Sequence, residues 1–199
     1  MPLTPFAVAD VNLDMKLDAD DQMMLAFQKG RVRAFDSLYG KYRQPLFGYM
    51  FRHVNDNALA EELFQDVWLR VVSAAESYQG KGRFRSWLFA MAHNRLVDHY
   101  RRQQADVTEL NEERLEGTVD QQAEEGQAAL ARQRLRQDLD EVVRLLPLEQ
   151  REVFYLREEA GLALKEIAEI QGITTEAAKS RLRYAYQKLR DALQQRGQK

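Results

Sequence analysis

Residues 164–190 read LKEIAEIQGITTEAAKSRLRYAYQKLR, and this stretch decides the fold expected for the C-terminal part of the chain. Gly172 can adopt the left-handed conformation that ends a helix, and Thr174 or Thr175 can cap the helix that follows. Two helices joined by such a tight turn, the second of them basic, are typical of a helix-turn-helix that enters the major groove of DNA. The apolar stripe of the second helix consists of Ala178, Leu182, Ala185, Leu189 and Leu193.

A different face of this second helix carries basic and hydroxyl side chains. Lys and Arg at these positions can reach phosphates or guanine edges. The alternative is a solvated basic face on a helix that only packs. The residues on or beside this face are Lys179, Ser180, Arg183, Tyr184, Tyr186 and Arg190.

The net charge of −2 conceals a strong segregation of charge along the chain. Residues 81–102 carry a net charge of +5, residues 103–130 carry −7, and residues 174–199 carry +5. Local fields decide whether a protein binds nucleic acid, so two basic blocks separated by an acidic one indicate a nucleic-acid-binding protein despite the pI near 6.0.

The remainder of the chain is also expected to be helical. Asp20 is predicted to cap a short helix that ends near Gly30, and Pro45 is predicted to kink or restart the next helix. A turn at residues 55–57 then separates it from a helix over residues 58–76. The apolar positions expected to be buried there are Ala60, Leu63, Phe64, Val67, Val71 and Ala75.

A further helix is expected from about Phe84 to Arg102, after a glycine-containing loop at residues 80–82. Basic and aromatic residues are mixed between Tyr78 and Arg102, a composition that suits single-stranded DNA because bases stack on rings while phosphates pair with cations. Trp87 is interpreted either as a core residue or as a stacking platform.

The predicted fold class is therefore all-α, with two small helical domains joined by a flexible acidic linker. Residues 103–127 lack helical periodicity and are rich in Gln and Glu. The expected division is a loose leader at 1–19, a domain at 20–102, the linker at 103–127 and a second domain at 128–199.

Several classes of protein are disfavoured by composition. The chain has no cysteine and three histidines, and it has neither a glycine-rich phosphate loop nor a nucleophile elbow. We expect no enzyme activity, no cofactor and no metal site. The sequence has no run of 18 apolar residues and no secretory signal, so we expect a cytoplasmic protein that does not insert into membranes.

Two blocks of sequence together resemble the sigma-70 family. Residues 60–70 (AEELFQDVWLR), 84–94 (FRSWLFAMAHN) and 98–102 (DHYRR) resemble its region 2. Residues 146–182, with Leu146-Pro147, Glu166-Ile-Ala168, Gly172-Ile173 and Lys179-Ser-Arg-Leu182, resemble its region 4. Two such regions with little between them are the layout of the extracytoplasmic-function (ECF) group.

The resemblance implies a sigma factor that binds core RNA polymerase and directs promoter-specific initiation. In the family, region 2 binds the β′ clamp helices and opens the −10 element, and region 4 binds the −35 element and the β-flap. Many members are held inactive by an anti-sigma factor. The acidic linker would either mimic nucleic acid in a basic channel or serve as a spacer.

The resemblance also implies roles for individual residues. The implied polymerase-binding residues are Glu62, Gln65, Asp66, Leu69 and Arg70. The implied DNA-binding residues of region 2 are Lys81, Arg83, Arg85, Trp87, Asn94, Arg95, Asp98, Arg101 and Arg102. Those of region 4 are Lys179, Ser180, Arg181, Arg183 and Tyr184.

Two competing interpretations remain open to test. A stand-alone regulator could pair the helix-turn-helix with a phosphate-receiving domain, but that domain needs alternating strands and an acidic pocket, which the N-terminal half does not indicate. An enzyme could use paired carboxylates, but Glu61-Glu62 and Glu158-Glu159 are adjacent in sequence and do not converge on one helical face. Co-elution with core RNA polymerase would separate a sigma factor from both.

Overall fold

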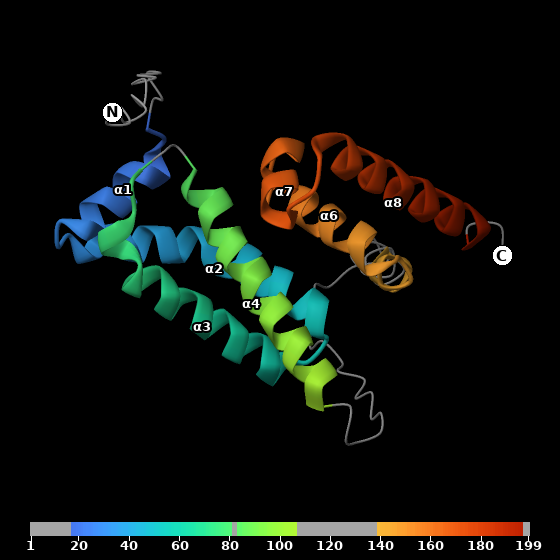
Figure 1. Cartoon of the computed structure of the whole chain (residues 1–199), viewed down its shortest axis with the longest axis horizontal. Coiled ribbons are helices and arrows are strands. Elements are labelled where there is room, and N and C mark those ends of the chain that lie inside the picture. Colours follow the sequence, from blue (N-terminus) through green and yellow to red (C-terminus); the bar gives the residue numbers. More distant parts are fainter. Residues whose placement is uncertain (1–16, 81–82, 107–138, 197–199) are drawn as a thin grey trace, which may run out of the picture.

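The structure, a computed structural model, describes residues 17–80, 83–106 and 139–196. Within these ranges it contains helices and no strand, which confirms the all-α prediction. Figure 1 shows two groups of helices side by side, the N-terminal group in blue to green and the C-terminal group in orange to red.

The N-terminal group is built around α2, which packs against both α1 and α3, while α3 packs against α4. Every apolar position that periodicity predicted to be buried between residues 60 and 75 is buried. The turn predicted at 55–57 is also present, because Asn55 is left-handed and Asp56 caps α3. The elements are α1 (Ala19–Gln28), α2 (Val32–Val54), α3 (Asn57–Ser73), the short 3-10 helix η1 (Ala75–Ser77) and α4 (Phe84–Asp106).

Helix α2 contains Pro45 in its interior. A restart after the proline is wrong, because one helix runs from Val32 to Val54. An interior proline removes a hydrogen bond and costs about 3 kcal/mol. Leu38 before it and Leu46 after it are both fully buried in the same core, so packing holds the helix together across the proline.

The N-cap of α1 is Asp18 rather than Asp20. The Oδ1 atom of Asp18 accepts a hydrogen bond of 2.8 Å from the Asp21 backbone N–H. Asp20 lies inside the first turn and is only 5% exposed. The prediction for Asp20 was wrong because the sequence alone does not distinguish an aspartate that caps a helix from one that is buried. The contacts of Asp20 with α2 show that it is the buried one.

The C-terminal group has the predicted helix-turn-helix. Gly172 ends α7 in the left-handed conformation, and Thr174 Oγ1 accepts a hydrogen bond of 3.1 Å from the Ala177 N–H, so Thr174 is the cap. Of the predicted apolar stripe, Ala178, Leu182, Ala185 and Leu189 are buried, whereas Leu193 near the end of α8 is half-buried. Residues 139–144 form a helical segment, and the later elements are α6 (Leu148–Glu158), α7 (Leu164–Gln171) and α8 (Thr175–Arg196).

The two groups pack against each other, chiefly through α4 and α7. The His53 and Tyr155 rings, one from each group, have centroids 5.3 Å apart, and Arg52 pairs with both Asp140 and Glu159. The sequence predicted an acidic tether between the groups but no contact. Residues 103–106 continue α4, and the rest of the predicted linker, 107–127, lies outside the described residues, as do residues 1–16 of the predicted leader.

Candidate nucleic-acid and polymerase interface

The candidate DNA-reading residues of helix α8 differ in solvent exposure. Lys179, Arg183 and Tyr184 are exposed, with the Arg183 guanidinium carbon 5.2 Å from the centre of the Tyr184 ring. The stripe that faces the other way is buried, so α6 and α7 support α8 from behind while these three side chains remain accessible. This arrangement suits insertion of the helix into a major groove.

Arg181 and Ser180 are half-buried. Arg181 forms an ion pair of 2.8 Å with Glu149 on α6 and donates a hydrogen bond of 3.4 Å to the Gln171 side chain on α7. In this structure Arg181 therefore connects the three helices of the C-terminal group rather than pointing away from them.

The loop between η1 and α4 forms one wall of a groove. The groove has a volume of about 410 Å³ and is lined by Tyr78, Gly80, Arg83 and Trp87, and by Ile170 of α7 on the opposite side. Trp87 is half-buried, and its ring packs on those of Tyr78 at 4.8 Å and Phe84 at 5.9 Å. Both interpretations of Trp87 thus have a counterpart in the structure, since its ring packs on two other rings and the residue also lines the groove.

The three cations predicted in this loop have different environments. Arg83 forms an ion pair of 2.7 Å with Glu169 of α7. Arg85 donates a hydrogen bond of 3.3 Å from Nε to the Tyr42 hydroxyl, and that bond raises the pKa of Arg85, so it stays charged. Lys81 lies outside the described residues.

Helix α4 does not present its predicted residues as one continuous exposed face. Asn94, Arg101 and Arg102 are exposed, and Asp98 is half-buried. Arg95 is 5% exposed, and its Nε lies 2.7 Å from Asp66 Oδ2 on α3. The prediction of a continuous face differs from the structure at Arg95 because α3 packs over that side of the helix.

Helix α3 exposes a strip with charged and apolar members. Glu62, Gln65 and Arg70 are exposed, and Leu69 is 66% exposed. Asp66 is half-buried because it pairs with Arg95. Sequence reasoning missed Val72, which is 45% exposed three residues beyond Leu69 and extends the apolar part of the strip. Its i+3 spacing from Leu69 was a signal that could have found it.

A titratable cluster that sequence reasoning also missed lies between the two groups. His93 Nδ1 of α4 is 3.9 Å from Glu152 Oε1 of α6, and Gln171 donates a hydrogen bond of 3.2 Å to the same carboxylate. Burial raises the pKa of Glu152 to about 7, lowers that of His93, and lowers that of the neighbouring His53 to about 4. The three residues come from separate helices, so spacing in the sequence held no signal for them.

Within the described parts of the chain, no group of three or more His, Asp or Glu side chains is arranged to hold a metal ion. No described helix is both long enough and apolar enough to cross a membrane.

Comparison with known proteins gives one match in the N-terminal group and one in the C-terminal group. Residues 38–105 match the family model for sigma-70 region 2, and residues 136–189 match that for sigma-70 region 4. The sigma factor YlaC of Bacillus subtilis is 31% identical over 142 residues, which cover 70% of this chain and 80% of YlaC. The sigma-H factor of Pseudomonas aeruginosa is 28% identical over 183 residues, which cover 89% of this chain and 95% of sigma-H. Other relatives are named as ECF sigma factors.

The fold has solved counterparts. The sigma factor RpoE of Bartonella quintana, crystallised with the anti-sigma factor NepR, superposes with a TM-score of 0.68 at 22% identity, covering 80% of this chain and 96% of RpoE. The chain belongs to the sigma-70 family of bacterial RNA polymerase sigma factors. Within that family its two-region layout and its relatives place it in the ECF group, whose members direct promoter-specific transcription initiation.

Proposed function

We propose that the N-terminal group binds core RNA polymerase through α3 and melts the −10 element through the η1–α4 loop, and that α8 reads the −35 element. The observation that carries this proposal is the separation of three surfaces: the mixed strip on α3, the groove with Arg83 and Trp87, and the exposed cations of α8. Partners of different chemistry can engage such surfaces at the same time.

The strip on α3 fits a protein partner. Leu69 and Val72 are exposed apolar side chains beside exposed Glu62, Gln65 and Arg70. Apolar anchors surrounded by polar residues are typical of protein interfaces. We assign the strip to the β′ clamp helices and the C-terminal group to the β-flap, as the family resemblance implies.

The groove fits an unstacked DNA strand. Trp87 lines the groove with a half-buried ring, Tyr78 lines it with a buried one, and Arg83, which pairs with Glu169, supplies a cation. Base stacking on an aromatic side chain contributes about 1–3 kcal/mol per base and tolerates many sequences. Asn94, Arg101 and Arg102, which lie further along α4, are proposed to contact the adjoining duplex.

We infer that the protein acts in the cytoplasm as an initiation factor without catalytic chemistry of its own. The solved relative RpoE binds an anti-sigma factor, and we propose that an anti-sigma factor also regulates this chain.

The polymerase surface is tested with Leu69→Asp in the full-length chain. Leu69 is 66% exposed, so the fold is expected to survive and co-elution with core polymerase to be lost. Val32→Asp is the matched control, because Val32 is an apolar residue at the start of α2 with 64% exposure that lies in the N-terminal group but outside the strip. Equal co-elution of both variants with core polymerase would refute the assignment.

A further inference from the structure

Helix α1 lies beneath the DNA-binding loop, although it lies outside the residues that match region 2. Asp21 of α1 accepts hydrogen bonds on the same oxygen, Oδ1, from the Tyr78 hydroxyl and from the Arg83 backbone N–H, the latter at 3.3 Å. Tyr78 precedes residues 79–82 and Arg83 follows them. One carboxylate oxygen therefore joins the two flanks of the loop.

Other residues of α1 hold the first flank of the loop. Gln28 Nε2 donates hydrogen bonds to the carbonyls of Ala75, Glu76 and Tyr78 at 3.0, 2.7 and 3.2 Å. Gly80 has φ +59°, and a Cβ there would lie 2.8 Å from Leu25 Cδ1. The backbone of the loop thus lies against α1, and a side chain at residue 80 would be strained by the positive φ and would require Leu25 to shift.

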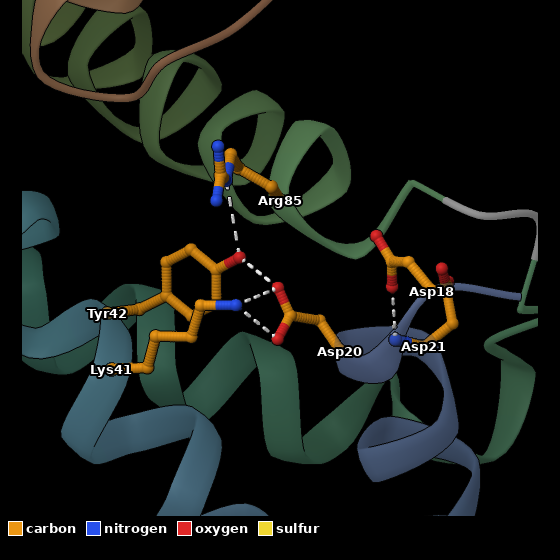
Figure 2. A network of polar contacts seen from close by, with 6 residues as sticks. All are labelled: Asp18, Asp20, Asp21, Lys41, Tyr42 and Arg85. Atoms are coloured by element: carbon orange, nitrogen blue, oxygen red, sulfur yellow. Dashed lines mark hydrogen bonds and ion pairs between the residues drawn. The ribbon is translucent and has the colours of Figure 1, made fainter.

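The second flank of the loop is also connected to α1 (Figure 2). Asp20 accepts hydrogen bonds from Lys41 Nζ at 2.6 Å and from the Tyr42 hydroxyl at 2.5 Å, and that hydroxyl accepts one from Arg85 Nε at 3.3 Å. Asp20 therefore orients Arg85 through Tyr42. Both arginines that follow the loop depend on a carboxylate of α1, Arg83 by its backbone and Arg85 by its side chain.

Burial of the Asp21 carboxylate costs free energy that a purely structural role does not explain. It is fully buried, its Oδ2 has no hydrogen-bond partner within the described residues, and burial raises its pKa against the opposing effect of the Tyr78 bond. A buried carboxylate with an unsatisfied oxygen is unfavourable, and apolar replacements are often equally stable or more stable. Its side chain bonds to both flanks of the loop, to the buried Tyr78 on one side and to the Arg83 backbone on the other.

We propose that Asp21 is a positioning residue for capture of the promoter strand, which it serves by holding Tyr78 and Arg83 at a constant separation in one wall of the groove. This inference rests on the proposed assignment of the loop to the −10 strand. Preorganised groups lose less conformational entropy on binding, so the bound strand gains affinity without contacting Asp21.

The test uses the full-length chain assembled with core polymerase. The probe is a short, labelled, randomised single-stranded oligodeoxynucleotide. Asp21→Ala is expected to weaken strand binding by about tenfold, equivalent to about 1.4 kcal/mol. Affinity for core polymerase is expected to stay at the wild-type value, because the strip on α3 does not contact Asp21.

The control separates positioning from general stability. Asp56→Ala removes an N-cap remote from the loop, where Asp56 Oδ1 accepts a hydrogen bond of 3.1 Å from the Leu59 N–H. Losing a cap typically costs about 1 kcal/mol. If Asp56→Ala weakens strand binding as much as Asp21→Ala does at the same unfolding midpoint, the role is structural and the inference is overturned.

A double-mutant cycle with Tyr78→Phe adds a second readout. This change removes only the hydroxyl that donates to Asp21, so its effect on strand affinity is expected to disappear once Asp21 is alanine. Additive effects would contradict the inference.

Amide hydrogen exchange provides a readout that needs no DNA. Asp21→Ala is expected to accelerate exchange at residues 79, 80 and 83, and unchanged exchange there overturns the inference. If exchange accelerates but the Lys81→Ala/Arg83→Ala/Arg85→Ala variant binds the strand as tightly as wild type, the proposed function of the loop fails instead, and the DNA part of the inference fails with it.

Discussion

The guanidinium of Arg83 and the carboxylate of Glu169 lie 2.7 Å apart, although 86 residues separate them in the chain. Arg83 borders the groove proposed to take the −10 strand, and Glu169 belongs to the first helix of the helix-turn-helix. In the function proposed above Arg83 pairs with a DNA phosphate, and in this structure the Glu169 carboxylate is paired with the same guanidinium. The packing of the two groups thus neutralises one cation of the surface proposed to bind DNA.

Glu169→Gln should raise the affinity of the free protein for single-stranded DNA, because Arg83 then keeps its charge for phosphate. Both side chains are 46% exposed, so the change in unfolding free energy should stay within about 1 kcal/mol. Fluorescence anisotropy at two salt concentrations measures the affinity. Glu61→Gln makes the same charge change on an exposed side chain of α3, and an equal gain from it would contradict the specific role of Glu169.

Asp66→Ala should destabilise the protein by about 1–3 kcal/mol, because it removes the closest carboxylate from the buried Arg95. Asp66 is 40% exposed at its side chain, which places the cost below that of a fully buried pair. The measurement is urea-induced unfolding. Adding Arg95→Met should restore much of the lost stability, and failure of that rescue would refute the explanation.

The polymerase-binding role of α3 is therefore better probed at Arg70 than at Asp66. Arg70 is 45% exposed and lies 3.7 Å from Asp98, a weak surface pair. Arg70→Glu should weaken the affinity for core polymerase while changing stability by less than about 0.5 kcal/mol. If Arg70→Glu bound core polymerase with wild-type affinity, Arg70 would not be part of the interface.

Glu152→Gln should stabilise the protein at pH 8 more than at pH 5. The pKa of Glu152 is raised from 4.5 to about 7 in the folded state, so the folded state retains a proton that the unfolded state loses. The free energy of unfolding therefore falls as pH rises through that window, by an amount on the order of 2 kcal/mol. Glutamine carries no titrating proton, so the Glu152→Gln variant does not lose this part of its unfolding free energy as pH rises.

The histidines oppose Glu152 below neutrality. The pKa of His53 is lowered from 6.5 to about 4, so its contribution to stability is present above pH 6.5 and is lost as pH falls toward 4. The comparison of wild type and Glu152→Gln at each pH cancels this background. Equal gains at pH 5 and pH 8 from urea midpoints would show that Glu152 does not titrate as described.

Arg183→Ala should relax sequence preference at particular −35 positions, since a bidentate arginine contact to guanine discriminates by about 1–3 kcal/mol. Lys179→Ala should lower affinity for all sequences alike and reduce the salt dependence. Transcription from a randomised −35 library distinguishes these patterns. Unchanged preference and output for Arg183→Ala would argue against α8 as the reading helix.

Arg181→Ala should behave differently from both, because Arg181 is engaged with Glu149 and Gln171. Its main effect should be a loss of stability, read from the thermal midpoint, without a change in −35 preference. A changed preference at normal stability would show that Arg181 leaves these partners to read DNA.

Local patterns in the sequence determined the helices, the turn at Gly172 and the buried stripes of α3 and α8, because 3.6-residue periodicity and capping chemistry act over a few neighbouring residues. The tertiary structure decided which polar residues are exposed and which are paired with another helix. Arg95 and Asn94 are neighbours in sequence, yet α3 covers only Arg95; Asp18 and Asp20 are equally good capping residues, yet only Asp20 meets Lys41 and Tyr42. Glu169 opposite Arg83 and Glu152 beside His93 depend on how two helical groups pack, and contacts between residues far apart in the chain leave no periodic signal in either segment.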